Sequence, residues 1–188
     1  MSGPDILPDD LPRPVADGAT DHLAGVAAPD LELATTGGTS VSLARRPGRI
    51  VVYVYPRTGE PGRDPGPEWN AIPGARGCTP QSCSFRDHFA ELRALGVSEV
   101  YGLSTQDTAY QREAAERLHL PFPLVSDERL ELTRALNLPT FDFGGMTLIR
   151  RMTLVIDDGR ITKVFYPVFP PDRSAADVVD WLRSGAGA

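Results

Sequence analysis

The two cysteines of this 188-residue chain, Cys78 and Cys83, are the side chains best suited to chemistry. They lie five residues apart in the segment Gly77-Cys78-Thr79-Pro80-Gln81-Ser82-Cys83. The segment opens a helical pattern, so Cys78 is expected in the first turn of a helix. Unpaired backbone N–H groups and the positive end of the helix dipole favour the thiolate there, and the thiolate is the reactive form of cysteine.

The spacing of the two cysteines limits when they can form a disulfide. In a regular helix, residues five apart have Cα atoms roughly 8–9 Å from each other. A disulfide needs Cα atoms within about 7 Å. The first turns of the helix must therefore unwind before Cys78 and Cys83 can join, and we expect the chain to change shape with its redox state.

The cysteine pair has two other possible roles, as buried hydrophobic residues or as metal ligands. Free cysteines are often small buried hydrophobic residues, but this pair lies at a loop-to-helix junction rather than on an apolar face. A metal site needs about four ligands, and the chain has no second cysteine pair and only scattered histidines, which are His22, His88 and His119. We expect no metal ion and no cofactor.

The elements that position Cys78 can be predicted from apolar patterns on either side of it. Residues 50–55 are apolar at nearly every position, which is typical of a strand covered on both faces. Downstream, Phe85, Phe89, Leu92 and Leu95 share one face of a single helix that ends at Gly96. The segment that carries Cys78 would therefore join a buried strand to an amphipathic helix.

The remaining pattern predicts the order of a known α/β arrangement. Further elements are expected as an N-terminal hairpin at 29–34 and 40–43, strands at 97–103, 122–125, 146–156 and 161–166, and helices at 107–118, 127–136 and 174–183. Strand–helix–strand–helix followed by a hairpin and a helix resembles the thioredoxin-like fold. We expect a central mixed β-sheet flanked by helices.

The chain is divided into an arm and one domain. Residues 1–22, rich in proline and aspartate, are expected to form an extended arm that is mobile or draped over the surface. Residues 23–188 form the domain. Within it, residues 56–77 hold five glycines and five prolines, so no regular element is expected there. Residues 57–77 are interpreted as an inserted active-site loop, in which Trp69 either caps a pocket or anchors the loop to the surface.

Composition excludes several classes of function. The chain has 25 acidic and 19 basic residues, a formal net charge of -6, and no basic run, so neither nucleic acid nor a membrane surface is an expected partner. No apolar stretch approaches the roughly 20 residues that span a bilayer. No basic and then apolar leader is visible. Two cysteines in this context favour a reducing compartment, and we expect the cytoplasm.

The segment 77–87, Gly-Cys-Thr-Pro-Gln-Ser-Cys-Ser-Phe-Arg-Asp, resembles the active-site segment of peroxiredoxins. The resemblance is to the Q-type, also called bacterioferritin comigratory protein, in which G-C-T-x-Q-x-C-x-x-R-D follows a strand that ends in Y-P. Here the strand ends in Tyr55-Pro56. Residues 124–128 and 151–157 are also similar to family motifs, and the resemblance covers about residues 22–184.

This resemblance implies a thiol-dependent peroxidase that reduces hydrogen peroxide or organic hydroperoxides. Cys78 would be the peroxidatic cysteine and Cys83 the resolving cysteine, joined in an intramolecular disulfide that a thioredoxin-like or glutaredoxin-like donor reduces. Arg151 matches the arginine that holds the thiolate and polarises the peroxide. Adjacent side chains on a strand face opposite ways, so Arg150 should point away from Cys78.

One departure from the family pattern concerns a threonine three residues before the peroxidatic cysteine. This chain has Ala75 there, and Thr58 lies about twenty residues upstream of Cys78. One hypothesis is that the insertion returns and leaves Thr58, or a neighbouring backbone N–H, beside Cys78. The alternative is that the loop supplies another group, such as Arg76.

Two other functions compete with the peroxidase as interpretations of the sequence. A thiol–disulfide oxidoreductase acting on proteins usually carries C-x-x-C, which is absent here. A non-enzymatic redox sensor would be oxidised slowly and would bind a partner only when the helix has unwound. The oligomeric state expected is a monomer, with a weak dimer as the alternative.

Overall fold

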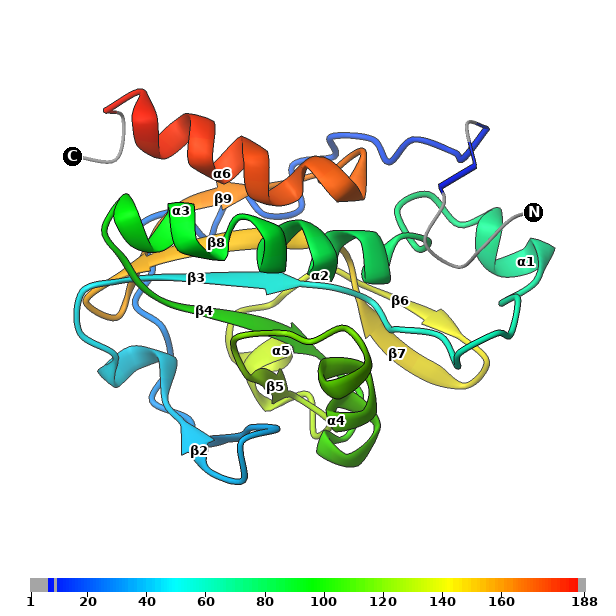
Figure 1. The fold of residues 1–188 in the computed structure, drawn as a ribbon, viewed down its shortest axis with the longest axis horizontal. Helices are drawn as coiled ribbons and strands as arrows, with labels where there is room; N and C mark the ends of the chain where they lie inside the picture. Colours follow the sequence, from blue (N-terminus) through cyan, green and yellow to red (C-terminus); the bar gives the residue numbers. More distant parts are fainter. Residues whose placement is uncertain (1–6, 9, 186–188) are drawn as a thin grey trace.

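The computed structural model describes residues 7–8 and 10–185, and a five-stranded sheet lies at its centre. The strands are β3 (Arg49–Val54), β4 (Val97–Ser104), β5 (Leu124–Ser126), β8 (Met152–Asp157) and β9 (Arg160–Phe165). Their order in the sheet is β5-β4-β3-β8-β9 (Figure 1). β3, β4 and β5 are parallel, whereas β8 and β9 are antiparallel to their neighbours. The predicted mixed sheet is confirmed.

The central strand β3 is buried on both faces because its residues alternate between two hydrophobic cores. Ile50, Val52 and Val54 face one core, and Val51, Tyr53 and Tyr55, the last directly after the strand, face the other. All six are fully buried. Burial of one such side chain contributes about 1.5–3 kcal/mol to stability. The strand β3 is therefore a stable support for the segment that follows it.

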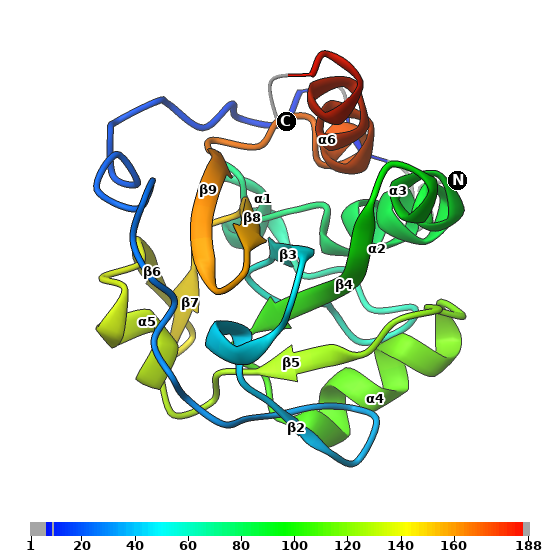
Figure 2. The ribbon, with the colours of Figure 1, turned by 90° about the vertical axis from the view of Figure 1, so that its left-hand side faces the viewer.

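The helices divide between the two faces. One face is covered by α2 (Cys78–Asp87), α3 (Phe89–Ala94), α4 (Thr108–Arg117) and α6 (Ser174–Arg183). The other is covered by α5 (Glu131–Ala135) and the hairpin of β1 (Leu33–Ala34) and β2 (Ser40–Val41). Figure 2 shows α2, α3 and α6 side by side over the sheet. The chain also has two short 3₁₀ helices, η1 (Leu43–Arg45) and η2 (Pro171–Arg173).

The helix predicted to run unbroken to Gly96 is two helices. α2 ends at Asp87 and α3 begins at Phe89, and His88 between them has φ -96° and ψ 5°. Nδ1 of His88 lies 2.9 Å from the carbonyl oxygen of Ser84, so the ring turns back onto the helix that it ends. The apolar spacing continues across this break, and for that reason the sequence does not reveal it.

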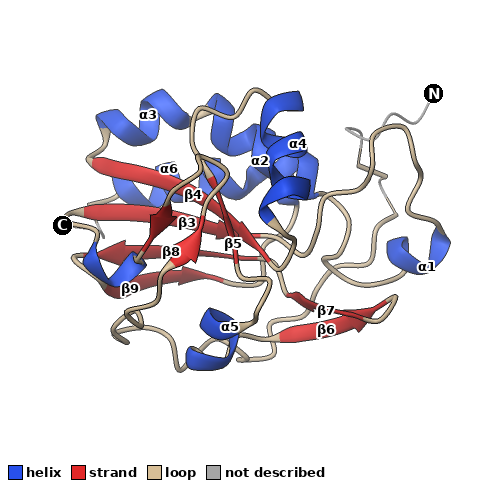
Figure 3. Ribbon diagram, turned by 90° about the horizontal axis from the view of Figure 1, so that it is seen from below, coloured by secondary structure: helices blue, strands red, loops and turns tan. Residues whose placement is uncertain are grey.

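The long strand predicted at 146–156 is also two strands. β7 (Met146–Ile149) pairs with β6 (Thr140–Phe143) in a separate hairpin, and β8 belongs to the central sheet (Figure 3). Arg150 and Arg151 lie between them. The chain therefore changes sheet at Arg151, which frees this side chain from the alternation of a single strand.

The glycine- and proline-rich segment contains a short helix that was not expected, α1 (Pro67–Asn70). Trp69 of α1 is buried and packs against two rings of the β6–β7 hairpin, with centroid distances of 6.1 Å to Phe141 and 5.0 Å to Phe143. Trp69 thus anchors the loop to a hairpin that the sequence pattern did not predict.

The described part of the N-terminal arm lies against the loop that precedes α6 and against the residues that precede α2. The guanidinium of Arg13 lies 5.1 Å above the ring of Phe169. The Leu7 side chain lies beside Gly77, and Pro14 lies beside Gly74. Residues 1–6 and 9 of the predicted arm are outside the described residues. Across the part of the chain that is described, no helix combines the length and apolarity needed to cross a bilayer.

Candidate active site

Cys78 is the first residue of α2, and Gly77 makes this helix start possible. Gly77 has φ +108°, in the left-handed region that glycine tolerates. A Cβ atom at this position would lie 2.5 Å from Cγ of Pro171, so no larger residue fits without a shift. The predicted position of Cys78, in the first turn of a helix beyond the buried strand, is confirmed.

The sulfur of Cys78 is buried beside a fixed cation. The residue is 4% exposed, and Nη2 of Arg151 lies 3.3 Å from its sulfur. The thiol also lies 3.6 Å from the carbonyl oxygen of Ala75, to which its neutral form donates. The Arg151 guanidinium is therefore placed to stabilise negative charge on this sulfur.

Arg151 is itself held rigidly. It is 3% exposed and donates to Oε1 of Gln81 at 2.5 Å and to the carbonyl oxygens of Ala75 and Arg76 at 3.0 and 3.1 Å. Longer bonds reach the carbonyls of Gly74 and Gly77. The guanidinium therefore fastens the end of the loop to the start of α2, and its charge does not need to reorganise when charge forms on sulfur.

Arg150 faces the other way. Its backbone N–H donates to Pro139, and its side chain reaches the carbonyl of Thr140 at 3.5 Å. Of the adjacent pair, Arg151 alone contacts Cys78 among the contacts shown for the described residues. This agrees with the expectation that only one of the two can point at the thiol.

Gln81 is a site residue for which the sequence alone predicted no role. It is fully buried, accepts from Arg151, and donates from Nε2 to Oγ of Ser174 at 3.2 Å. Its position three residues after Cys78 was the available signal, because residues three apart share a helix face. A side chain three residues after Cys78 can contact the same group as Cys78 does, and this group is Arg151.

Cys83 lies on α2 with intermediate exposure, and neither cysteine is in a disulfide. Since α2 runs unbroken from Cys78 to Asp87, the helical geometry that keeps the two Cα atoms apart is present. A hydrogen bond to Asp87 raises the pKa of Arg86; burial opposes the rise, and the charge and hydrogen bonding of Cys83 add to it. The Arg86 guanidinium is therefore placed to stabilise a Cys83 thiolate.

Tyr53 of β3 lies beneath α2 and supports it. Its hydroxyl donates to Oγ of Ser82 at 3.1 Å, and its ring stacks on Phe85 at 4.5 Å. Burial raises the pKa of Tyr53 well above its ordinary value, and the neighbouring Tyr55 and the two cysteines add to the rise. The phenol thus stays neutral and takes no proton from the thiols.

Thr58 is buried, but its hydroxyl has another partner. Both the backbone N–H and Oγ1 of Thr58 donate to Oε1 of Gln106, at 2.9 and 3.2 Å. A catalytic role for Thr58 stays a prediction. The position three residues before Cys78 is occupied by Ala75, whose carbonyl is bound by Arg151. Arg76 lies in the site, where its side chain donates to Asn70 at 2.9 Å.

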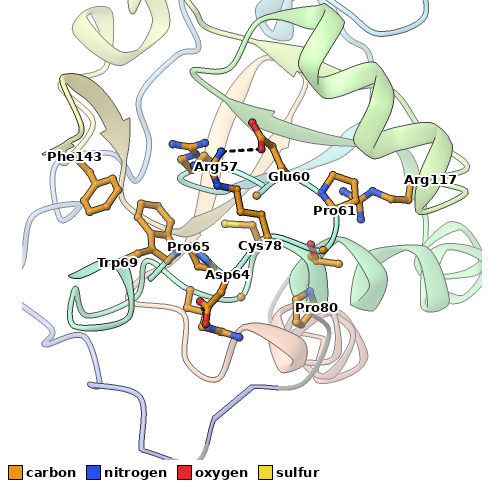
Figure 4. Close-up of a pocket in the computed structure, with 16 residues that line it drawn as sticks. Arg57, Glu60, Pro61, Asp64, Pro65, Trp69, Cys78, Pro80, Arg117 and Phe143 are labelled. Carbon is orange, nitrogen blue, oxygen red and sulfur yellow. Dashed lines mark hydrogen bonds and ion pairs between the residues drawn. The ribbon is translucent and has the colours of Figure 1, made fainter. Parts of the chain in front are cut away.

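A cavity of about 570 Å³ opens beside Cys78. Its walls come from the inserted loop, the first turn of α2, the β6–β7 hairpin and α4. Figure 4 shows Cys78 between Trp69 and Phe143 on one side and Arg117 on the other. The loop that ends at Cys78 therefore forms part of the wall of this cavity, and its role as an active-site loop stays a prediction.

Comparisons with known proteins agree with this geometry. The Redoxin family model matches residues 23–179. Peroxiredoxin Q, chloroplastic, of Oryza sativa subsp. japonica is 33% identical over 162 residues, which cover 85% of this chain and 66% of the relative. The same-named protein of Sedum lineare is 31% identical, with 85% and 77% covered. The chain thus spans just under two thirds of the rice relative.

Solved structures lead to the same family. The crystal structure of peroxidoxin BcpB from Mycobacterium tuberculosis superposes with a TM-score of 0.68 at 26% identity, and the match covers 86% of this chain and 96% of that one. The resemblance of the active segment, the buried Cys78–Arg151 contact and these matches all agree. The chain belongs to the redoxin family, and within it to the peroxiredoxin Q type.

Proposed function

We propose that this protein is a thiol-dependent peroxidase that reduces hydrogen peroxide or organic hydroperoxides. The observation that carries the proposal is the 3.3 Å contact between Arg151 and the sulfur of Cys78, at the start of a helix and at the wall of a cavity. A thiolate held beside a fixed cation meets the two needs of the reaction. It is a nucleophile, and charge that moves onto the leaving oxygen is stabilised nearby.

In the first step, the Cys78 thiolate attacks one oxygen of the peroxide. The O–O bond breaks, the sulfur gains an oxygen as sulfenic acid, and the other oxygen leaves as water or an alcohol after taking a proton. Arg151 stabilises negative charge on both sulfur and oxygen. Gln81 acts through Arg151 and is a positioning residue.

In the second step, Cys83 resolves the sulfenic acid. The Cys83 thiolate attacks the sulfur of Cys78, the S–O bond breaks as the disulfide forms, and the leaving hydroxide takes a proton to become water. The intact helix separates the two residues, so the first turns of α2 unwind beforehand. A thioredoxin-like or glutaredoxin-like donor then returns both thiols through disulfide exchange.

The exposure of Cys78 favours peroxide over a protein disulfide as the oxidant. At 4% exposed, the sulfur of the folded state is open to a small molecule in the cavity and closed to a sulfur carried on a protein surface. After α2 unwinds, the disulfide becomes accessible to a protein reductant. This asymmetry supports the peroxidase over the thiol–disulfide oxidoreductase.

Rapid mixing of the reduced protein with hydrogen peroxide tests the proposal. Trp69 lies in the cavity wall, so its fluorescence should report on oxidation. We expect a fast phase that is lost in Cys78→Ser and a slower phase that is lost in Cys83→Ser. Oxidation of the unaltered protein no faster than that of free cysteine, with every peroxide tried, would contradict the proposal.

A monomer in the cytoplasm is our proposal for the state and place in which the enzyme works. It is supported by a resolving cysteine within the same helix, which makes a second chain unnecessary for the disulfide. Size-exclusion chromatography with light scattering of the reduced protein tests the monomer. A dimer at micromolar concentration would contradict it.

A further inference from the structure

Positively charged side chains outnumber negatively charged ones in the wall of the cavity beside Cys78. Its wall holds four arginines but only two carboxylates, those of Glu60 and Asp64. Three of the arginines lie against acidic side chains, in the ion pairs Arg63–Glu60 at 3.1 Å, Arg76–Asp64 at 3.8 Å and Arg117–Glu113 at 2.8 Å. The fourth, Arg57, has no such partner among the described residues.

Arg57 lies three residues after the end of β3 and is half-buried at the cavity wall. The side-chain hydrogen bond shown for it goes to the sulfur of Met146, at 3.7 Å. A thioether is a weak acceptor, whereas a guanidinium has five N–H donors in a planar fork. Most of these donors remain available to a ligand that enters the cavity.

The rest of the wall is suited to a hydrocarbon. Trp69 and Phe143 meet edge to face with centroids 5.0 Å apart, and both line the cavity together with Pro61 and Pro65. Figure 4 shows Arg57 between these rings and Glu60, with Cys78 behind. An apolar wall with one available cation and one nucleophile matches an amphipathic ligand rather than a fully polar one.

We propose that this cavity selects hydroperoxides that carry a carboxylate on a hydrocarbon body, and that Arg57 is the residue that determines this selectivity. The inference rests on the proposed peroxidase function. The hydrocarbon packs against Trp69 and Phe143, and the carboxylate accepts two hydrogen bonds from Arg57.

The carboxylate takes no part in the chemical step. The Cys78 thiolate attacks the terminal oxygen of the hydroperoxide, and the O–O bond breaks. The remaining oxygen leaves with the bonding electrons, takes a proton, and departs as the hydroxy acid. The sulfur retains one oxygen as sulfenic acid, as with any peroxide.

The test uses three peroxides on the full chain: hydrogen peroxide, cumene hydroperoxide with a para carboxylate, and the methyl ester of that acid. Rate constants for Cys78 oxidation are measured by rapid quench. We expect the acid to react about tenfold faster than the ester, because a paired hydrogen bond to a carboxylate is lost in the ester. Raising the ionic strength should reduce the ratio.

Variants assign the effect to one residue. Arg57→Gln should bring the acid-to-ester ratio to about one, and Arg57→Lys should keep part of it. Arg117→Gln is the matched control, because Arg117 lines the same cavity but is paired with Glu113. It should keep the ratio. The ratio is measured within each variant, so a general effect of the substitution on Cys78 cancels.

The outcomes separate this inference from the function on which it rests. If hydrogen peroxide oxidises Cys78 rapidly but acid and ester react equally, the selectivity is overturned and the peroxidase stands. If Arg117→Gln abolishes the ratio as fully as Arg57→Gln, the assignment to Arg57 is overturned. If no peroxide oxidises Cys78 rapidly, the function fails, and the inference fails with it. Circular dichroism of each variant excludes misfolding as the cause.

Discussion

One nitrogen of Arg151, Nη2, lies 3.3 Å from the sulfur of Cys78 and also donates to the carbonyls of Ala75 and Arg76. A single guanidinium therefore holds both the nucleophile and the loop that leads to it. Arg151 reaches this place because the chain changes sheet between β7 and β8. The electrostatics of the thiol and the shape of the loop end thus depend on the same side chain.

Replacing Arg151 with glutamine should slow oxidation of Cys78 by hydrogen peroxide about 100-fold, because a fixed charge on the developing anion is lost. Stopped-flow fluorescence measures the rate. Arg150→Gln is the control: Arg150 is adjacent in sequence but directed to the carbonyl of Thr140, and its rate should not change. Equal losses in the two variants would show that Arg151 does not act on the thiol.

Replacing Gly77 with alanine should lower the free energy of unfolding by about 1–3 kcal/mol, because a Cβ there is strained at φ +108° and meets Pro171 at 2.5 Å. Urea unfolding measures the change. Gly96→Ala separates the two causes, since Gly96 has φ +92° but open space around an added Cβ. Gly77→Ala should be the more destabilising, and the reverse order would contradict the close contact with Pro171.

Replacing Arg86 with glutamine should slow disulfide formation several-fold without a comparable effect on the first oxidation. The reason is that Arg86 adjoins Cys83, and loss of its charge leaves a smaller fraction of Cys83 as thiolate. Raising the pH should restore the rate, which a purely structural defect would not allow. Arg93→Gln, at an exposed position of α3, is the control and should leave both phases unchanged.

The ion pair of Arg49 and Asp157 should make stability depend on pH. Burial would raise the pKa of Asp157, but hydrogen bonds from Arg49 and Thr162 outweigh burial and hold it below its ordinary value of 3.8. A lowered carboxyl pKa stabilises the fold above the unfolded-state pKa, and the stabilisation is lost as the pH falls through the folded-state pKa. Its loss is therefore expected below about pH 4.

Asp157→Asn tests this pair. At pH 7 the variant should be less stable by about 1 kcal/mol in urea, and the difference should be smaller at pH 3, which lies below the unfolded-state pKa of about 3.9 at which this stabilisation begins to be lost. A difference of the same size at both pH values would mean that the cost comes from packing or hydrogen bonding rather than from charge.

Local patterns predicted the parts of the fold that short-range forces determine. The apolar run of β3 and the helix start at Cys78 follow from burial and local chain geometry. The family motif indicated Arg151, but the alternation expected of a strand does not apply, because Arg150 and Arg151 lie between β7 and β8. The break at His88 could not be predicted, because the apolar face continues from Phe85 to Leu92 across it. At the break, the His88 ring contacts the carbonyl oxygen of Ser84, and such a contact does not alter hydrophobic periodicity.

The wall of the cavity depends on contacts between segments distant in the chain. Trp69 packs on Phe141 and Phe143, more than 70 residues downstream. The residues around Trp69 in the sequence do not indicate these two partners. The sequence therefore left two alternatives open, that Trp69 caps a pocket or that it anchors the loop to the surface. Arg57 is similar: its importance comes from lacking an acidic partner in the cavity, which only the spatial arrangement of all four arginines reveals.

The central claim is that Cys78 reacts with peroxide and Cys83 resolves the product. The most direct measurement is mass spectrometry of Cys83→Ser after brief exposure to one equivalent of hydrogen peroxide, with a reagent that labels sulfenic acid. The account predicts one oxygen, and the label, on Cys78, and a disulfide between Cys78 and Cys83 in the unaltered protein. An unmodified Cys78 in the variant, or oxidation that begins at Cys83, would contradict it.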